Sequence, residues 1–349
     1  MTRVPIAGRD VRVGMLSVAH VHAPWYLEAL AAMPGVALVG LWDEDAELAD
    51  DRARAVGTQA FGELGPLLDA VDAVVIAGVN RDHRALVEQA AAAGRHVLCE
   101  KPLATSVPDA IAIVEACRTA GVRLMTAFPS RTNSVVESLA ASIRAGEVGE
   151  VVSFEGVNSG EMPDVHGAWF VDPALAGGGA VTDHVVHLAD LCRWLSGSEV
   201  REVYAVANRI LQDGFDAVET GGLVTLRFEN AIFATIDCSW SKPRAYPTWG
   251  GMTLEVLGTG GALDMDAFRQ HLDVYGRREE GVRWPFFGSD ANAAMLAEFI
   301  AAVREDREPA VTGMDGLRAV EIVDAAYRSI ASGQPVRLER TPDAAATRD

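Results

Sequence analysis

The 349-residue sequence lacks paired cysteines and lacks an excess of positive charge. Its four cysteines stand singly, without C-x-x-C spacing, and they are Cys99, Cys117, Cys192 and Cys238. This scatter argues against a disulfide framework or a zinc site and favours buried thiols in a reducing compartment. Lys and Arg number 30 against 49 Asp and Glu, a formal charge of −19. Because nucleic acids and anionic membranes bind basic surfaces, neither is an expected partner.

Long apolar runs, a signal peptide and internal repeats are also missing. The longest apolar runs, as in residues 73–79, have about seven residues, too few to cross a bilayer. Residues 1–10 carry charge with no apolar stretch behind them, so no secretory signal is expected. The sequence therefore predicts a cytoplasmic protein, and its length suggests two domains.

Residues 1–128 alternate short apolar runs with helical patterns, which is typical of a parallel, doubly wound sheet. Runs rich in Val, Ile and Leu predict strands covered on both faces over residues 11–16, 37–42, 73–77, 96–98 and 122–127. Patterns that end at glycine predict helices over residues 24–33, 46–56, 84–93 and 108–120. We predict an α/β Rossmann-type domain.

Residues 129–340 have a different pattern, in which strands follow one another through short turns such as 228–231. The expected strands are 151–157, 203–210, 222–228, 232–239, 252–257 and 272–275. The expected helices are 185–195, 291–305 and 317–331. We predict an α+β domain with a mainly antiparallel open sheet, followed by a disordered tail over residues 341–349.

The first strand–helix turn is where a doubly wound sheet binds a dinucleotide. A G-x-G-x-x-G pattern there lets backbone N–H groups approach the pyrophosphate at a helix N-terminus. Here Ser17, Ala19 and His22 occupy the three glycine positions. Ser and Ala still permit a close approach, whereas His22 does not suit the tight packing of a third glycine. Pro24 is favoured at a first helical position, so the helix could begin a residue or two later.

Asp43 ends the second expected strand, 21 residues after His22. An acid at this position accepts hydrogen bonds from the adenosine ribose. The alternative is a solvated acid at a strand end, since further acids follow it. No arginine stands between it and Arg52, so the 2′-phosphate of NADP would meet only negative charge, which favours NAD.

His20 and His22 have a competing interpretation. Two histidines one residue apart at a strand end are typical metal ligands in amidohydrolase-type barrels. That fold would need eight strand–helix units, and the second half of the chain does not supply them. Histidines that line a cofactor or substrate pocket, or that lie on the surface, are the other interpretations. We assign no metal ligands.

Several motifs together resemble the Gfo/Idh/MocA family, which includes glucose–fructose oxidoreductase and inositol dehydrogenase. The matching residues are G-x-H-V-x-x-E-K-P-x-A over 94–104, Gly177–Gly179, Asp183-x-x-x-His187-x-x-Asp190, Thr312, Asp315-Gly316 and Tyr327-x-Ser329. The resemblance spans about residues 11–338. The departures are the altered glycine turn and Gly78-Val79, where many members have Thr-Pro.

The resemblance implies that Lys101, Asp183 and His187 are catalytic, with His187 as the acid/base. Oxidation of an alcohol needs a base, a cation near the developing alkoxide and a nicotinamide. A desolvated Lys101 can polarise the substrate oxygen. Asp183 and His187, four residues apart, share one helical face, and a histidine ring exchanges protons near neutrality. The alternatives are a surface ion pair of Lys101 with Glu100 and a purely structural Asp–His contact.

Further site residues follow from the same resemblance. Cofactor contacts are expected from Ser17, Ala19, His20, His22, Asp43, Asn80, His83, Glu100 and Lys101. Substrate contacts are expected from Lys101, Arg131, His166, Trp169, Asp183 and His187. Arg131 could instead be a surface charge and Trp169 a core residue, while Asp190 is as consistent with a structural partner as with a substrate ligand. The triple glycine suits a tight turn before the catalytic helix.

The expected function is NAD(P)-dependent interconversion of a hydroxyl and a keto group on a sugar, cyclitol or sugar derivative, with a small polyhydroxylated substrate and NAD preferred over NADP. The site would lie between the two domains, since Lys101 comes from one and His187 from the other. Family members often associate through the open face of the second sheet, so a homodimer or homotetramer is expected. The alternatives are a metal-dependent hydrolase using His20 and His22, and a catalytically silent dehydrogenase-like binding protein.

Overall fold

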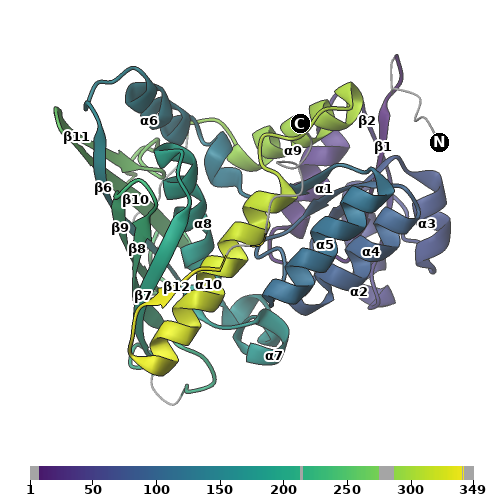
Figure 1. Ribbon diagram of the computed structural model, residues 1–349. Coiled ribbons are helices and arrows are strands. Elements are labelled where there is room, and N and C mark those ends of the chain that lie inside the picture. The colour runs from purple at the N-terminus through teal and green to yellow at the C-terminus, as the bar shows by residue number, and fades with distance from the viewer. Residues whose placement is uncertain (1–7, 213–214, 275–286, 340, 342–349) are drawn as a thin grey trace. The chain divides into compact units, whose positions relative to one another are not determined.

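A computed structural model describes residues 8–212, 215–274, 287–339 and 341. The chain divides into two compact units (Figure 1). The first consists of Met1–Pro129 and Asn292–Val320, and the second of Ser130–Ala291 and Glu321–Asp349. The first segment of the first unit ends at Pro129, next to the boundary expected after residue 128, but residues 292–320 also belong to the first unit. The expected tail, residues 341–349, lies outside the described residues except for Thr341.

The first unit contains a five-stranded parallel sheet with the order β2-β1-β3-β4-β5. Its strands are β1 (Val11–Leu16), β2 (Val36–Trp42), β3 (Ala73–Ile76), β4 (His96–Cys99) and β5 (Leu124–Thr126). Every residue of β3, β4 and β5 is buried. Strands of this kind read as continuous apolar runs because both of their faces are covered. The predicted Rossmann-type sheet is confirmed.

Helices connect these strands. They are α1 (Ala23–Ala32), α2 (Ala46–Val56), α3 (Leu64–Ala70), the 3-10 turn η1 (Asn80–Asp82), α4 (His83–Ala92), α5 (Val107–Ala120) and α9 (Ala291–Glu305), with α10 (Gly313–Ser332) starting in this unit. Asp45 and Ser106 cap α2 and α5, and Gly57 and Gly121 end them in the left-handed conformation. Figure 1 shows α4 and α5 side by side. The sequence did not predict α3, whose seven residues are too few for a periodic pattern.

The second unit contains a seven-stranded sheet with the order β11-β10-β6-β9-β8-β7-β12. Its strands are β6 (Val151–Gly160), β7 (Val200–Asn208), β8 (Gly221–Phe228), β9 (Phe233–Ser239), β10 (Gly250–Gly258), β11 (Gly261–Asp266) and β12 (Val336–Arg337). Only the β6–β9 pair is parallel, so the predicted mainly antiparallel sheet is confirmed. Burial alternates along β8 and β9, as expected when one face is covered and the other is open.

Helix α8 covers the buried face of this sheet. It packs against β6, β8 and β9, and Gly156 of β6 permits the approach, since a Cβ there would lie 2.8 Å from Leu188 Cδ1. The helical segments of this unit are η2 (Pro129–Thr132, whose first residue belongs to the first unit), α6 (Ser134–Arg144), η3 (Pro163–His166), η4 (Ala168–Val171), α7 (Pro173–Ala176), α8 (Ala180–Ser196) and the later part of α10. The sequence predicted this helix over residues 185–195, so the predicted start is five residues too late. A glycine turn directly precedes the true start.

The strand expected over residues 272–275 is wrong over its described part, because residues 272–274 form no strand; Tyr275 lies outside the described residues. The sequence also missed β11 and α6. All four cysteines are buried and free, as predicted. Among the described residues, no helix combines the length and apolar character needed to cross a membrane.

Candidate functional site

The residues expected to bind a dinucleotide gather at one edge of the five-stranded sheet. Residues 17–22 follow β1, Asp43 follows β2, Asn80 and His83 follow β3, and residues 100–101 follow β4. Parallel strands present their carboxyl ends at a single edge, where open α/β sheets bind ligands. All nine expected cofactor residues therefore lie on this edge.

Ser17 adopts the backbone conformation that the first glycine of the pattern would normally supply. Its φ angle is +59°, in the left-handed region that few side chains enter. Gly78, at the end of the neighbouring strand, makes room for it, because a Cβ on Gly78 would lie 2.7 Å from Ser17 Cβ and Oγ. The altered turn and Gly78-Val79, the two departures noted in the sequence, thus compensate each other.

Asp43 holds this turn in place. Its Oδ2 accepts hydrogen bonds from Ser17 Oγ (2.9 Å) and Val18 N (2.7 Å), and its Oδ1 accepts one from Asp45 N (2.9 Å). A carboxylate offers roughly four acceptor positions, so about one remains for a ribose hydroxyl. The carboxylate, at 9 % exposure, therefore shapes the turn as well as marking the ribose position.

The turn fits a dinucleotide at the start of α1. The first turn of this helix contains no acidic residue, and no side chain caps its N–H groups. A helix N-terminus of this kind favours an anionic group such as a pyrophosphate. Pro24 lies in the first turn of the helix, where its missing N–H costs no hydrogen bond.

Glu100 is a buried carboxylate that joins α1 to the end of β4. Its Oε1 accepts hydrogen bonds from Tyr26 OH (2.5 Å) and His22 Nδ1 (2.8 Å), and its Oε2 accepts one from Lys101 N (2.9 Å). Burial alone would raise the pKa of Glu100, but His20, His22 and Lys101 hold it well below its usual range. Glu100 is therefore ionised.

His20 is buried next to this carboxylate. Its Nδ1 accepts a hydrogen bond from His22 N (3.2 Å) and lies 3.7 Å from Glu100 Oε1. Burial lowers the pKa of His20 well below its usual value, although Glu100 opposes the shift. Among the described residues, His20, His22 and Glu100 form the one group with metal-ligand atoms within 4.8 Å of one another.

Lys101 and His83 lie on the turn that follows β4. Lys101 is 4 % exposed and precedes a cis peptide bond to Pro102. His83 Nδ1 donates a hydrogen bond to Pro102 O (3.0 Å), and burial lowers the pKa of His83. The desolvated lysine expected from the sequence is therefore present, and the fully buried His83 supports the turn that carries it.

In the second unit, Asp183 and His187 share the accessible stripe of α8. From Ala180 to Arg193 this helix buries every residue except these two. Their separation of four residues places them on one face, as the sequence predicted. A polar pair kept accessible on an otherwise buried helix is available to a ligand.

Trp240 orients Asp183, a role that sequence reasoning missed. Its Nε1 donates a hydrogen bond to Asp183 Oδ2 (3.1 Å), and its side chain is 1 % exposed in a cluster with Ala180 and Val218. From the sequence, a tryptophan that follows a strand is predicted to be a core residue. Only the packing of α8 on β9 places Trp240 next to the Asp183 carboxylate.

A second carboxylate, Glu219, fixes the beginning of α8. Its Oε1 accepts hydrogen bonds from Gly179 N (3.0 Å), Val181 N (3.0 Å) and Tyr327 OH (2.7 Å). A Cβ on Gly178 would lie 1.9 Å from Tyr327 OH, so glycine is required there. The triple glycine thus forms a tight turn into α8, and Glu219 already accepts hydrogen bonds from the N–H groups at the start of this helix.

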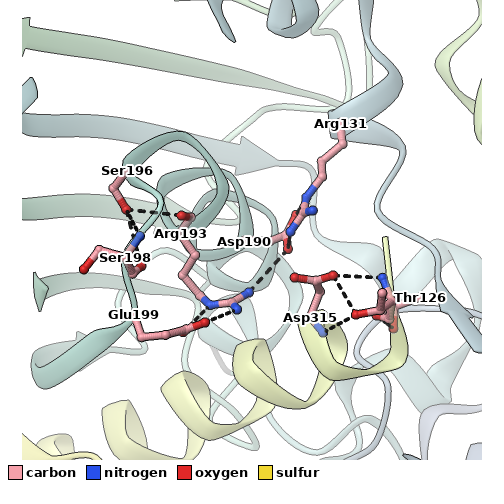
Figure 2. Close-up of polar contacts among 9 residues, drawn as sticks. Thr126, Arg131, Asp190, Arg193, Ser196, Ser198, Glu199 and Asp315 are labelled. Atoms are coloured by element: carbon pink, nitrogen blue, oxygen red, sulfur yellow. Dashed lines mark hydrogen bonds and ion pairs between the residues drawn. The ribbon is translucent and has the colours of Figure 1, made fainter. Parts of the chain in front are cut away.

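Arg131 and Asp190 form a buried ion pair in the second unit (Figure 2). Arg131 Nε and Nη2 donate to Asp190 Oδ2 (2.7 Å) and Oδ1 (2.5 Å), and the two side chains are 8 % and 0 % exposed. Arg193, which is itself paired with Glu199, lies 3.8 Å from the same Asp190. This geometry favours Asp190 as a structural partner of Arg131 over Asp190 as a substrate ligand.

His166 and Trp169, expected to line a substrate pocket, lie in the 3-10 turns before α7. His166 is exposed, whereas Trp169 is half-buried and stacks on Phe170 with ring centroids 3.8 Å apart. This stacking matches the core alternative for Trp169.

The chain is similar to known oxidoreductases over nearly its whole length. Residues 11–128 match the family model described as oxidoreductase family, NAD-binding Rossmann fold, and residues 136–264 match the GFO/IDH/MocA C-terminal domain. D-apiose dehydrogenase of Paraburkholderia graminis is 30 % identical over 95 % of this chain and 89 % of its own. D-xylose 1-dehydrogenase (NADP(+)) 2 of Haloferax volcanii is 31 % identical over 82 % of this chain and 89 % of its own. The structure of GenD2 from gentamicin A biosynthesis, in complex with NAD, has a TM-score of 0.87 and 28 % identity, covering 97 % of this chain and 99 % of that one.

Proposed function

Because the chain belongs to the GFO/IDH/MocA family of oxidoreductases, we propose that it interconverts a hydroxyl and a keto group on a sugar, cyclitol or sugar derivative. The relatives are dehydrogenases of polyhydroxylated compounds, which supports this substrate class. The observation that carries the proposal is the Asp183–His187 pair, kept accessible on a helix that is otherwise buried from Ala180 to Arg193.

The nicotinamide, when bound, supplies a hydride acceptor or donor. Lys101 donates a hydrogen bond to the reacting oxygen of the substrate and stabilises the charge that develops there. His187 accepts the hydroxyl proton on a ring nitrogen in one direction and returns it in the other. Asp183, held by Trp240, orients the His187 ring or binds a neighbouring hydroxyl. Asn80 contacts the cofactor and His166 contacts the substrate in this proposal, whereas Trp169 packs on Phe170.

NAD is the preferred cofactor in this proposal. Ser17, Ala19 and His22 form the turn that faces the pyrophosphate, and Asp43 accepts from the ribose. Asp43 is followed by Glu44, Asp45 and Glu47, so the phosphate of NADP would meet negative charge. The similar GenD2 structure contains NAD, whereas the similar D-xylose 1-dehydrogenase of Haloferax volcanii is named for NADP. Fluorescence titration with NADH and NADPH should give the lower Kd for NADH.

The experiment that tests the reaction combines a polyol and keto-sugar screen with His187→Ala. This variant should lose roughly 10²- to 10⁴-fold in turnover while its Kd for NADH stays unchanged. His271→Ala, a loop histidine of the second unit, is the matched control and should keep full turnover. Unchanged turnover in His187→Ala would remove this residue from the mechanism. If the wild type binds NADH but turns over no compound, the silent binding protein is the better description.

The metal-dependent hydrolase finds no support, because it required an eight-unit barrel and the chain forms open sheets of five and seven strands.

A second copy of the chain covers the open face of the seven-stranded sheet in this proposal. The strand registers place large apolar side chains on that face, each 40–47 % exposed: Tyr204, Val206, Leu223, Phe233 and Leu257. An exposed apolar face of this kind typically marks an interface. Sedimentation should give the mass of a dimer or tetramer, and Leu223→Asp should shift it towards the monomer. A monomeric wild type at working concentration would refute the assembly.

A further inference from the structure

The turn after β1 contains two histidines where dinucleotide-binding turns usually contain glycine or other small residues. The third glycine of the usual pattern lets the first helix pack closely on its strand. His22 stands there, and its ring lies against Trp25, with centroids 5.4 Å apart, while its Nδ1 reaches Glu100. Tyr26 lies four residues later, on the same helical face, and donates to the same oxygen.

These contacts form what we call the Glu100 network: His22, Tyr26 and the Lys101 N–H group, all bound to one carboxylate. The network connects the start of α1 to the end of β4. It involves a buried charge, and a carboxylate in such a place holds its donors strongly. One end of the network is the turn that faces the pyrophosphate, and the other is the backbone of Lys101.

An ion shared by His20, His22 and Glu100 is the competing explanation. All three residues are already hydrogen-bonded within the protein, since His20 Nδ1 accepts from His22 N and Glu100 Oε1 accepts from both His22 and Tyr26. A metal would have to displace these hydrogen bonds and the protons in them. The existing bonds therefore favour a protein network.

We propose that His22, Tyr26 and Glu100 are positioning residues for the dinucleotide, which hold a turn without glycines in the shape that binds the pyrophosphate. The proposal rests on the NAD-dependent function proposed above. It assigns to His22 a role that a glycine cannot have, because the side chain fixes the turn through a hydrogen bond.

The test measures the Kd of three ligands, NADH, ADP-ribose and adenosine, for the full chain and for His22→Ala, Tyr26→Phe and Glu100→Gln. His271→Ala, which removes a histidine ring of the second unit outside this network, is the matched control. Loss of a charge-assisted hydrogen bond costs roughly ten-fold or more in an equilibrium constant. The three variants should therefore bind NADH and ADP-ribose roughly ten-fold more weakly, with adenosine almost unaffected and the control unchanged.

The Kd of the double variant His22→Ala/Glu100→Gln for NADH should not exceed the higher of the two single-variant Kd values, because the two residues share one interaction. Thermal unfolding checks that each variant is folded. Folded variants that bind NADH as the wild type does would overturn the inference alone. A wild type that binds neither NADH nor NADPH would overturn the proposed function and the inference with it. One equivalent of tightly bound metal that His22→Ala loses would overturn the inference in favour of an ion site.

Discussion

Replacing Arg131 by methionine should lower the free energy of unfolding of the second unit by about 3–5 kcal/mol. Arg131 makes two hydrogen bonds to Asp190, whose side chain is 0 % exposed, and removing the guanidinium takes both away from a buried carboxylate whose distance to Arg193 is 3.8 Å. Methionine keeps much of the aliphatic packing, so the loss reports on the charge. The same change tests whether Arg131 is a substrate ligand, as the sequence suggested, or a structural residue.

Urea unfolding followed by tryptophan fluorescence is a suitable assay, since Trp194 lies 5.6 Å from the Arg131 guanidinium. Arg227→Met is the control: its ion pair with Glu202 is 3.1 Å long but the arginine is 56 % exposed, so the expected loss is below about 1 kcal/mol. Adding Asp190→Leu to Arg131→Met should restore much of the stability, because the buried carboxylate that lost its partner is then removed and Arg193 keeps its pair with Glu199. A loss under about 1 kcal/mol together with a raised KM would refute the reasoning and make Arg131 a substrate ligand.

Three further predictions concern other parts of the chain. Trp240→Phe should lower kcat roughly ten-fold and shift the pH profile of turnover, because Asp183 loses the hydrogen bond from the indole N–H; an unchanged profile would make Trp240 a packing residue only. Burial raises the pKa of Asp72, but hydrogen bonds from two arginines outweigh it and hold the pKa well below its usual value, so its contribution to stability is present above about pH 4 and is lost as the pH falls further. Asp72→Asn should therefore flatten the acid limb of the stability curve, and an unchanged limb would contradict this. Burial raises the pKa of Cys117 to about 12, and the other three cysteines are raised as well, so no thiol should react with a disulfide reagent at pH 8 until the chain unfolds; reaction of the folded chain would show an exposed thiolate.

The fold was largely predictable because its signals are local. Strands covered on both faces read as apolar runs, and the helices α2 and α5 carry their caps and terminal glycines in the sequence. The short helix α3 and the strand β11 were missed, since seven and six residues give too little periodicity. The return of residues 292–320 to the first unit was also invisible, because a helix does not encode which neighbour it packs on.

The sequence by itself determined the residue types of the site: a lysine after a strand, an acid at the end of β2 and an Asp–His pair at helical spacing. Only the tertiary structure decided which partners these residues have. In the structure, Asp43 accepts a hydrogen bond from Ser17, Asp183 accepts one from Trp240, and Arg131 donates to Asp190. The physical reason is that spacing along the chain fixes which residues share a face, whereas a hydrogen bond between residues far apart in the chain depends on how separate elements pack.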